Sequence, residues 1–136
     1  MGNIVIDTSV WIDFFNKKNS PKIEIVKSLI ITETVVSNIT LLPVIIQEIL
    51  QGIQNNKHYD VVKESLAGFN HLVYDNYDFA VSAADLYRYL QKKGVTVRKA
   101  NDCLIASLCI EYDFPILHND RDLDNIAKHT SLKTYK

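Results

Sequence analysis

The chain is short of cysteine, of net charge and of long apolar segments, and each shortage excludes a class of protein. Its only cysteines, Cys103 and Cys109, lie six positions apart on one expected helix and cannot reach each other. We therefore expect buried thiols in a reducing compartment. The formal net charge of −1 argues against a protein that holds nucleic acid by bulk electrostatics, since such proteins are strongly basic. A local basic strip remains compatible with it.

Long apolar runs are also missing: none approaches the roughly 20 residues that span a bilayer. The N-terminus lacks the basic and apolar regions of a signal peptide, so we predict a cytoplasmic protein without a membrane anchor. The hydrophobic content of 47% is that of an ordinary globular protein. With no internal repeat, low-complexity segment or long linker, residues 1–136 are expected to form a single domain.

Short apolar segments alternate with helical ones along the chain. Strands are predicted at 4–6, 34–37, 71–74, 115–117 and 132–135. Helices are predicted from Thr8 or Ser9 to about 15, around 23–30, and at 40–51, 57–69, 80–91, 101–112 and 123–128, with Thr40 near an N-cap. This alternation predicts an α/β architecture with a mainly parallel sheet.

Four scattered carboxylates stand where such a fold would gather them: Asp7, Glu48, Asp102 and Asp120. Asp7 and Asp120 each follow a predicted strand, and Asp102 begins a predicted helix. Acids at these positions converge on one edge of an α/β sheet, where such folds bind ligands. Because converging acids repel unless a cation lies among them, the pattern predicts a hard divalent ion and a metal-dependent hydrolase.

Each acid taken alone has a structural alternative. Asp7 could be only a helix cap, Asp102 a first-turn acid favoured by the helix dipole, and Asp120 a turn residue. A glutamate within a helix is usually solvated, although Glu48 has apolar neighbours on several sides. The four acids together, at equivalent topological positions, favour a functional explanation.

The segments that carry the acids form an ordered set over essentially the whole chain. They are DTSVWID from residue 7, EILQGI from residue 48, NDCLIA from residue 101 and HNDRD from residue 118. In this order they resemble a PIN-domain ribonuclease, and most of all the VapC toxins of bacterial and archaeal toxin–antitoxin pairs. The resemblance implies a PIN-like three-layer sandwich, with a central, mainly parallel sheet flanked by helices.

The resemblance also implies a chemistry. Asp7, Glu48, Asp102 and Asp120 become catalytic acids that hold Mg²⁺ or Mn²⁺ and cleave RNA by hydrolysis, without a covalent nucleophile, leaving a 5′-phosphate. Hydrogen bonds from the side chains around the acids would orient them; the candidates are Thr8, Ser9 and Asn101. Asp122 and Asp124 are candidate auxiliary acids. His118 stands where many relatives have Thr or Ser, and it could itself touch phosphate.

A basic run leads into Asp102; it comprises Lys92, Lys93, Arg98 and Lys99. Arg98 and Lys99 are candidate contacts for RNA phosphates, since backbone contacts position a nucleic acid strand. The alternative is a solvated helix end and loop.

The aromatic residues Trp11, Phe14 and Phe15 are expected mainly in the core. The resemblance implies that a VapB-type antitoxin peptide occupies an apolar groove near the first helices, to which a partly exposed Trp11 or Phe15 would contribute. It further implies a homodimer, for which Tyr87 and Tyr89 are candidate contacts, and DNA contact only through the antitoxin.

Rival interpretations belong to other classes. A receiver-type signalling domain should have a second acid close to the first and a lysine after a late strand, where this chain has His118-Asn119-Asp120. A haloacid-dehalogenase-type phosphatase needs an aspartate at the position of Ser9. A non-catalytic PIN-like RNA-binding or scaffold protein stays open, as does a processing nuclease that acts without an antitoxin.

Overall fold

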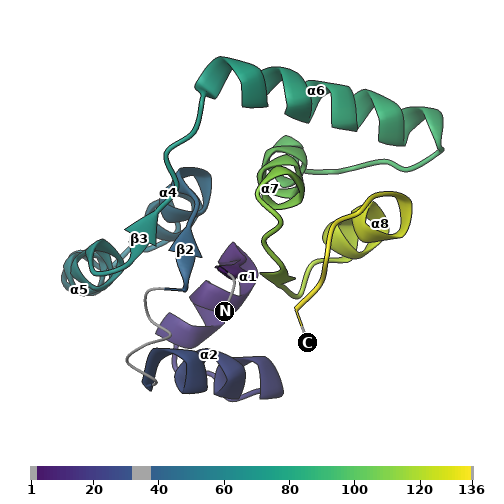
Figure 1. Ribbon diagram of the computed structural model, residues 1–136. Helices are drawn as coiled ribbons and strands as arrows, with labels where there is room; N and C mark the ends of the chain where they lie inside the picture. The colour runs from purple at the N-terminus through teal and green to yellow at the C-terminus, as the bar shows by residue number, and fades with distance from the viewer. Residues whose placement is uncertain (1–2, 32–37, 136) are drawn as a thin grey trace.

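The computed structural model describes residues 3–31 and 38–135, which fold into short strands flanked by helices (Figure 1). The strands are β1 (Val5–Ile6), β2 (Thr40–Leu41), β3 (Asn70–His71) and β4 (Ile116–Leu117). The helices are α1 (Thr8–Phe15), α2 (Pro21–Ile31), α4 (Pro43–Gln51), α5 (Asn56–Ala67), α6 (Asn76–Lys92), α7 (Ala100–Glu111) and α8 (Arg121–His129). The order of strands and helices confirms the predicted α/β class.

All pairings among the described strands are parallel. β1 pairs with β4, and β2 pairs with β3, as two two-stranded sheets. A parallel bridge between Ile4 and Ile39 joins the two sheets, with Ile4 N donating to Asn38 O at 2.7 Å and Thr40 N donating to Ile4 O at 2.9 Å. The residues that follow β1 and β4 therefore emerge at the same edge.

Among the helices in the described part of the chain, α7 has the most buried residues, and it packs against both α6 and α8 (Figure 1). Its sequence is apolar on nearly every face, which is the pattern of a helix enclosed by protein. The buried residues of α7 are Asp102, Cys103, Ile105, Ala106, Ser107, Leu108 and Cys109. Asp102, in the first turn of this helix, is therefore enclosed by the protein core.

The predicted 40–51 helix was wrong at its N-terminal end. Thr40 lies in β2, and α4 begins at Pro43, with Leu42 as an N-cap in extended conformation (φ −93°, ψ 134°) that makes no side-chain cap bond. Proline disfavours helical backbone at the preceding residue and fits the first turn of a helix. The β-branched Ile39 and Thr40 are consequently free to pair as strand.

Other boundaries differ by smaller amounts. α6 begins at Asn76 rather than at residue 80, because Asp75 caps it by accepting a hydrogen bond from Asp78 N at 2.8 Å. The strand expected at 71–74 is centred earlier, at Asn70–His71, and the one expected at 132–135 is reduced to a bridge between Thr134 and Ile116. The strand predicted at 34–37 lies outside the described residues.

The two thiols are free and buried, as the sequence predicted. Burial raises the pKa of Cys103 to about 11 and the pKa of Cys109 to about 12. None of the helices in the described ranges is long and apolar enough to cross a membrane.

Candidate active site

Two of the predicted acids cap helices at the shared edge of β1 and β4. Asp7 directly follows β1 and is the N-cap of α1; Asp120 is the N-cap of α8, three residues after β4. Asp7 N donates to Leu117 O at 2.9 Å, so the two strand exits lie side by side. The cap role considered for Asp7 is therefore real, and it does not remove the side chain from the site.

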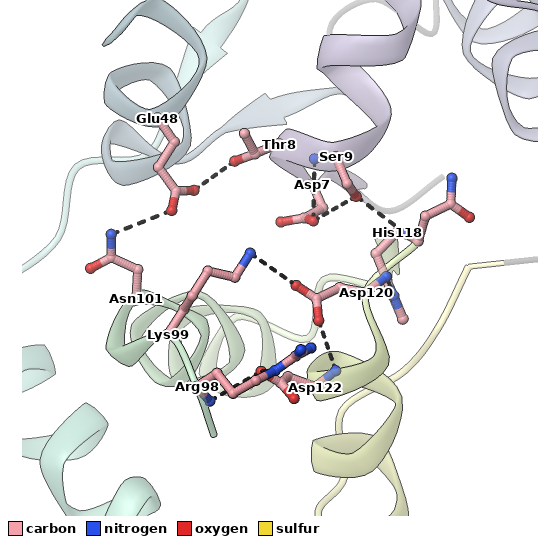
Figure 2. Close-up of polar contacts among 11 residues, drawn as sticks. Asp7, Thr8, Ser9, Glu48, Arg98, Lys99, Asn101, His118, Asp120 and Asp122 are labelled. Atoms are coloured by element: carbon pink, nitrogen blue, oxygen red, sulfur yellow. Dashed lines mark hydrogen bonds and ion pairs between the residues drawn. The ribbon is translucent and has the colours of Figure 1, made fainter. Parts of the chain in front are cut away.

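Ser9 fixes the Asp7 carboxylate. Its hydroxyl donates to Asp7 Oδ2 at 2.8 Å and accepts from Asn119 N at 3.3 Å, which ties the β1 exit to the β4 exit (Figure 2). Asp7 is buried. Burial raises the pKa of Asp7, and the nearby charge of Asp120 adds to the rise, against the lowering effect of the Ser9 hydrogen bonds.

Three buried aspartates make up what we call the acidic cluster: Asp102, Asp120 and Asp122. Each offers a carboxylate oxygen, and these oxygens lie within 4.8 Å of one another. Asp102 is 2% exposed, and among the described residues its Oδ2 has no hydrogen-bond partner. An unpartnered buried acceptor is costly in the absence of a ligand.

Two members of the acidic cluster, Asp102 and Asp120, have pKa values shifted in opposite directions. Burial, reinforced by the charge of Asp120, raises the pKa of Asp102 to about 7. Burial alone would also raise the pKa of Asp120, but hydrogen bonding from the Asp122 amide and the Lys99 ammonium outweighs it and lowers that pKa. A neighbouring cation would favour ionisation of Asp102 and let all the carboxylates act as ligands.

Basic side chains that precede α7 pair with the acidic cluster. Lys99 Nζ lies 3.3 Å from Asp120 Oδ2, and Arg98 contacts Asp122 Oδ2 through both its backbone N, at 3.1 Å, and its Nε, at 3.3 Å (Figure 2). Partial burial would lower the pKa of Lys99, but the charges of Asp102 and Asp120 outweigh it and raise that pKa. The two basic residues thus lie against the acids rather than in a separate strip.

Glu48 reaches the site from α4 by a different network. Its Oε1 accepts from Thr8 Oγ1 at 2.6 Å and its Oε2 accepts from Asn101 Nδ2 at 3.4 Å. Figure 2 shows the Lys99 side chain extending between the Glu48–Asn101 pair and Asp120. Glu48 therefore faces the acidic cluster from the other side of the Lys99 ammonium, outside the set of three closely spaced aspartates.

His118 is a structural residue of the loop between β4 and α8. It is 3% exposed, and its Nδ1 accepts from Asp120 N at 3.1 Å. In the neutral ring Nε2 then carries the proton, facing Thr134 Oγ1 at 3.5 Å and Asp124 Oδ1 at 3.6 Å. Burial lowers the pKa of His118 despite the surrounding acids. The suggested contact between His118 and phosphate is therefore wrong, because the ring is enclosed.

A comparison with family models decides what kind of domain carries this geometry. The model described as the PIN domain matches residues 4–129, which is nearly the whole chain. The chain belongs to the PIN domain family.

Sequence relatives identify the subfamily of this PIN domain. Ribonuclease VapC11 from Mycobacterium tuberculosis is 37% identical over 131 residues, covering 96% of each chain. VapC ribonuclease Mb1587 from Mycobacterium bovis matches with the same identity and coverage. This PIN domain is thus a member of the VapC family. The receiver and dehalogenase interpretations are excluded.

Solved structures agree on the fold. DNA-bound VapBC from Salmonella typhimurium matches with a TM-score of 0.76 at 19% identity, over 99% of this chain and 98% of that one. The match shows that the parallel strands and flanking helices described above form a PIN fold.

The PIN domain brings the predicted acids together unevenly. Asp102 and Asp120 lie in the acidic cluster, Asp7 and Glu48 border it, and Asp122 joins it at 4% exposure. Asp122 was considered only an auxiliary acid, because its place in the first turn of α8 does not reveal that the Arg98 backbone covers it. Asp124 faces outward and is exposed, and its carboxylate pairs with His118.

The residues of the acidic cluster fit a metal ion. Carboxylate oxygens are the hard ligands that divalent cations such as Mg²⁺ and Mn²⁺ prefer, and the orphaned Oδ2 of Asp102 is an acceptor that a cation would satisfy. Hydrogen bonds from Ser9, Thr8 and Asn101 hold the Asp7 and Glu48 carboxylates in place at the border of the cluster.

The aromatic residues of α1 divide between core and surface. Trp11 is fully buried, so it belongs to the core and cannot line an open groove. Phe15 is half-buried and lines a cavity of about 320 Å³ with Ile12, Asn16, Ile49, Gly52, Ile53, Gln54, Asn55 and His58. We call this cavity the α1–α4 groove.

On α6, Tyr87 and Tyr89 are exposed, and Tyr89 donates to His129 O at 3.3 Å.

Proposed function

We propose that this PIN domain is a metal-dependent endoribonuclease toxin that an antitoxin protein inhibits. One observation carries the proposal: three buried aspartates converge, with an unpartnered carboxylate oxygen, in a chain whose full-length relatives are named ribonucleases. Acids brought this close repel one another strongly unless a cation is bound. A site built this way is better explained by ligand binding than by stability.

Asp7, Asp102 and Asp120 would hold the ion, with Asp122 beside them. A bound Mg²⁺ or Mn²⁺ would acidify water and neutralise charge on a phosphodiester. Glu48, fixed by Thr8 and Asn101, lies opposite and can orient a water that approaches phosphorus. That water attacks phosphorus and the 3′-oxygen leaves with a proton, so the products carry a 5′-phosphate and a 3′-hydroxyl.

Arg98 and Lys99 have the positions and exposure to contact RNA as well as acids. Their side chains are 69% and 60% exposed, respectively, while the carboxylates they pair with are buried. Cations at the rim of an acidic site can lead a phosphate backbone toward it, since phosphate contacts position the strand. Contact with RNA remains a proposal for both residues.

The α1–α4 groove would receive the antitoxin. The structural relatives include complexes named VapBC, one of them bound to DNA. We propose a VapB-type partner for this chain, an apolar segment of which occupies the groove, and contact with DNA only through that partner. A homodimer with Tyr87 and Tyr89 near its interface is part of the same proposal.

Cleavage of a structured RNA pool by the purified, antitoxin-free protein tests the activity. We expect cutting with Mg²⁺ or Mn²⁺, none in EDTA, and none by Asp7→Asn. Asparagine caps a helix about as well as aspartate, so the variant should retain its fold and lose only a charged ligand. The products should carry 5′-phosphates, detectable by their susceptibility to a 5′-phosphate-dependent exonuclease.

Asp75→Asn is the matched control. Asp75 caps α6 through Asp78 N, in the same way that Asp7 caps α1, but it lies outside the acidic cluster. It should cut like the wild type. Folded wild-type protein that cuts no RNA in the pool would favour the non-catalytic PIN-like alternative, and cutting that survives in Asp7→Asn would contradict the assigned site.

A further inference from the structure

Lys99 stands closer to the acids than a substrate contact requires. Its Nζ lies 3.3 Å from Asp120 Oδ2, and it interacts electrostatically with Asp102 and Asp7 as well. One ammonium thus faces three carboxylates that come from three different parts of the chain. In Figure 2 the side chain extends into the space that Glu48, Asp7 and Asp120 border.

The pairing is unlike an ordinary surface salt bridge. Asp120 is 9% exposed, so its charge is poorly solvated and needs a partner more than a surface carboxylate does. Lys99 is the N-cap residue of α7, in extended conformation (φ −114°, ψ 116°), and its ammonium, which has donors but no acceptor, cannot cap the helix itself. Its long side chain is therefore available for the acids.

We infer that the Lys99 ammonium is the built-in cation of the carboxylate site, and that a divalent ion binds in exchange for it. The inference rests on the proposed function, because it assumes that the acids bind metal. A monovalent ammonium cannot satisfy all the carboxylate oxygens: Oδ2 of Asp102 stays without a partner among the described residues. A divalent ion brings twice the charge and several coordination positions to the same oxygens.

Exchange gives Lys99 two positions with different roles. Paired with Asp120, it keeps the ion-free site assembled by limiting repulsion among the acids. Displaced from Asp120, its side chain, already 60% exposed, is free for a phosphate group at the rim. The same residue therefore weakens the binding of the ion and stabilises the protein without it.

Calorimetric titration with Mn²⁺ alone, in the absence of RNA, tests the exchange on wild type, Lys99→Met and Lys22→Met. Lys22 is the matched control because its Nζ bonds the amide oxygen of Asn119, next to Asp120, at 2.7 Å. Its removal subtracts the same charge from the same neighbourhood without releasing Asp120. We expect Lys99→Met to bind Mn²⁺ roughly tenfold more tightly, the size expected for a partly exposed charge pair at this distance, and Lys22→Met to stay near wild type.

Thermal unfolding provides a second readout that does not depend on activity. In EDTA, Lys99→Met should unfold at a lower temperature than the wild type, because the acids have lost their counter-charge. Saturating Mn²⁺ should raise its Tm by more than it raises that of the wild type. Lys99→Gln keeps a hydrogen-bond donor without the charge, so its Tm should shift in the same directions as that of Lys99→Met. It serves as a second variant in case the methionine variant does not fold.

The outcomes separate the inference from the proposed function. If the wild type binds Mn²⁺ and the Lys99 variants bind it equally or more weakly, the exchange would be overturned, but the metal site would not. An equal gain in Lys22→Met would also overturn it, since the effect would be one of general charge. If neither wild type nor the Lys99 variants bound Mn²⁺, the metal site itself would be wrong.

Discussion

Replacing Asp102 with asparagine should stabilise the metal-free protein, although it removes a proposed ligand. Asp102 is 2% exposed, next to the charge of Asp120, and its pKa is raised from 3.8 to about 7. At about 1.4 kcal/mol per pKa unit, ionised Asp102 destabilises the metal-free fold by roughly 4 kcal/mol. Because the lowered pKa of Asp120 and the lost charge at the start of α7 offset part of this, we expect a net gain of about 2 kcal/mol.

Because the pKa of Asp102 is raised in the folded state, the stability gained by Asp102→Asn depends on pH. Below pH 3.8 the Asp102 carboxyl is protonated in both the folded and the unfolded chain, and asparagine confers no advantage. As the pH rises, the unfolded chain ionises first, so the wild type loses stability until the folded carboxyl also ionises near pH 7. The difference between Asp102→Asn and wild type should grow over this range and level off above it.

Urea unfolding in EDTA measures this difference directly. The chain has a single tryptophan, Trp11, which is fully buried and reports unfolding by its fluorescence. Mn²⁺ should reverse the order of stability by stabilising the wild type alone, through binding to the folded state. The reasoning is refuted if, in EDTA at pH 8, Asp102→Asn is no more stable than the wild type. Asp75→Asn should track the wild type throughout.

Two further predictions concern the neighbours of the acidic cluster. Thr8→Val removes the 2.6 Å hydrogen bond to Glu48. We expect kcat/KM for RNA to fall about 10- to 100-fold and the free energy of unfolding to fall by about 1 kcal/mol. A larger effect on unfolding than on cleavage would contradict the positioning role of Thr8. Ile12→Glu places a charge in the α1–α4 groove at a side chain that is 38% exposed; co-purification with the antitoxin should be lost while RNA cleavage persists. Val81→Glu, on α6 and 43% exposed, should retain both and serves as its control.

Much of the fold could be predicted from local patterns. By its length, the short apolar run of Ile4–Ile6 predicts a buried strand, and the longer, largely apolar segment 101–112 predicts a buried helix. Thr40 shows where this reasoning fails. A threonine before a helical pattern is a good cap, but Pro43 begins the helix three residues later, and Thr40 instead donates its amide to Ile4 and pairs with β3. Strand pairing is a long-range event that local preference does not reveal.

The candidate site was predictable in its outline but not in its details. Strand exits identified Asp7 and Asp120, because the carboxyl ends of parallel strands share an edge. The burial of Asp122 depends on the Arg98 backbone folding over it from 24 residues away, which no local pattern records. Arg98 and Lys99 read as an acid-free basic run in the sequence; in three dimensions they are paired with acids.

Asp7 and Asp120 each cap a helix, and each also lies in the candidate site, Asp120 within the acidic cluster and Asp7 at its border; this double role has a genetic consequence. The codons of aspartate and asparagine differ by a single base, and both residues cap helices well. On the proposed site assignment, one substitution at either position would therefore abolish the activity while helices α1 and α8 still form. A population exposed to such an enzyme can escape it by a point mutation that leaves a folded, inert protein behind. The same inert protein would still present the α1–α4 groove, and so would compete with active copies for whatever binds there.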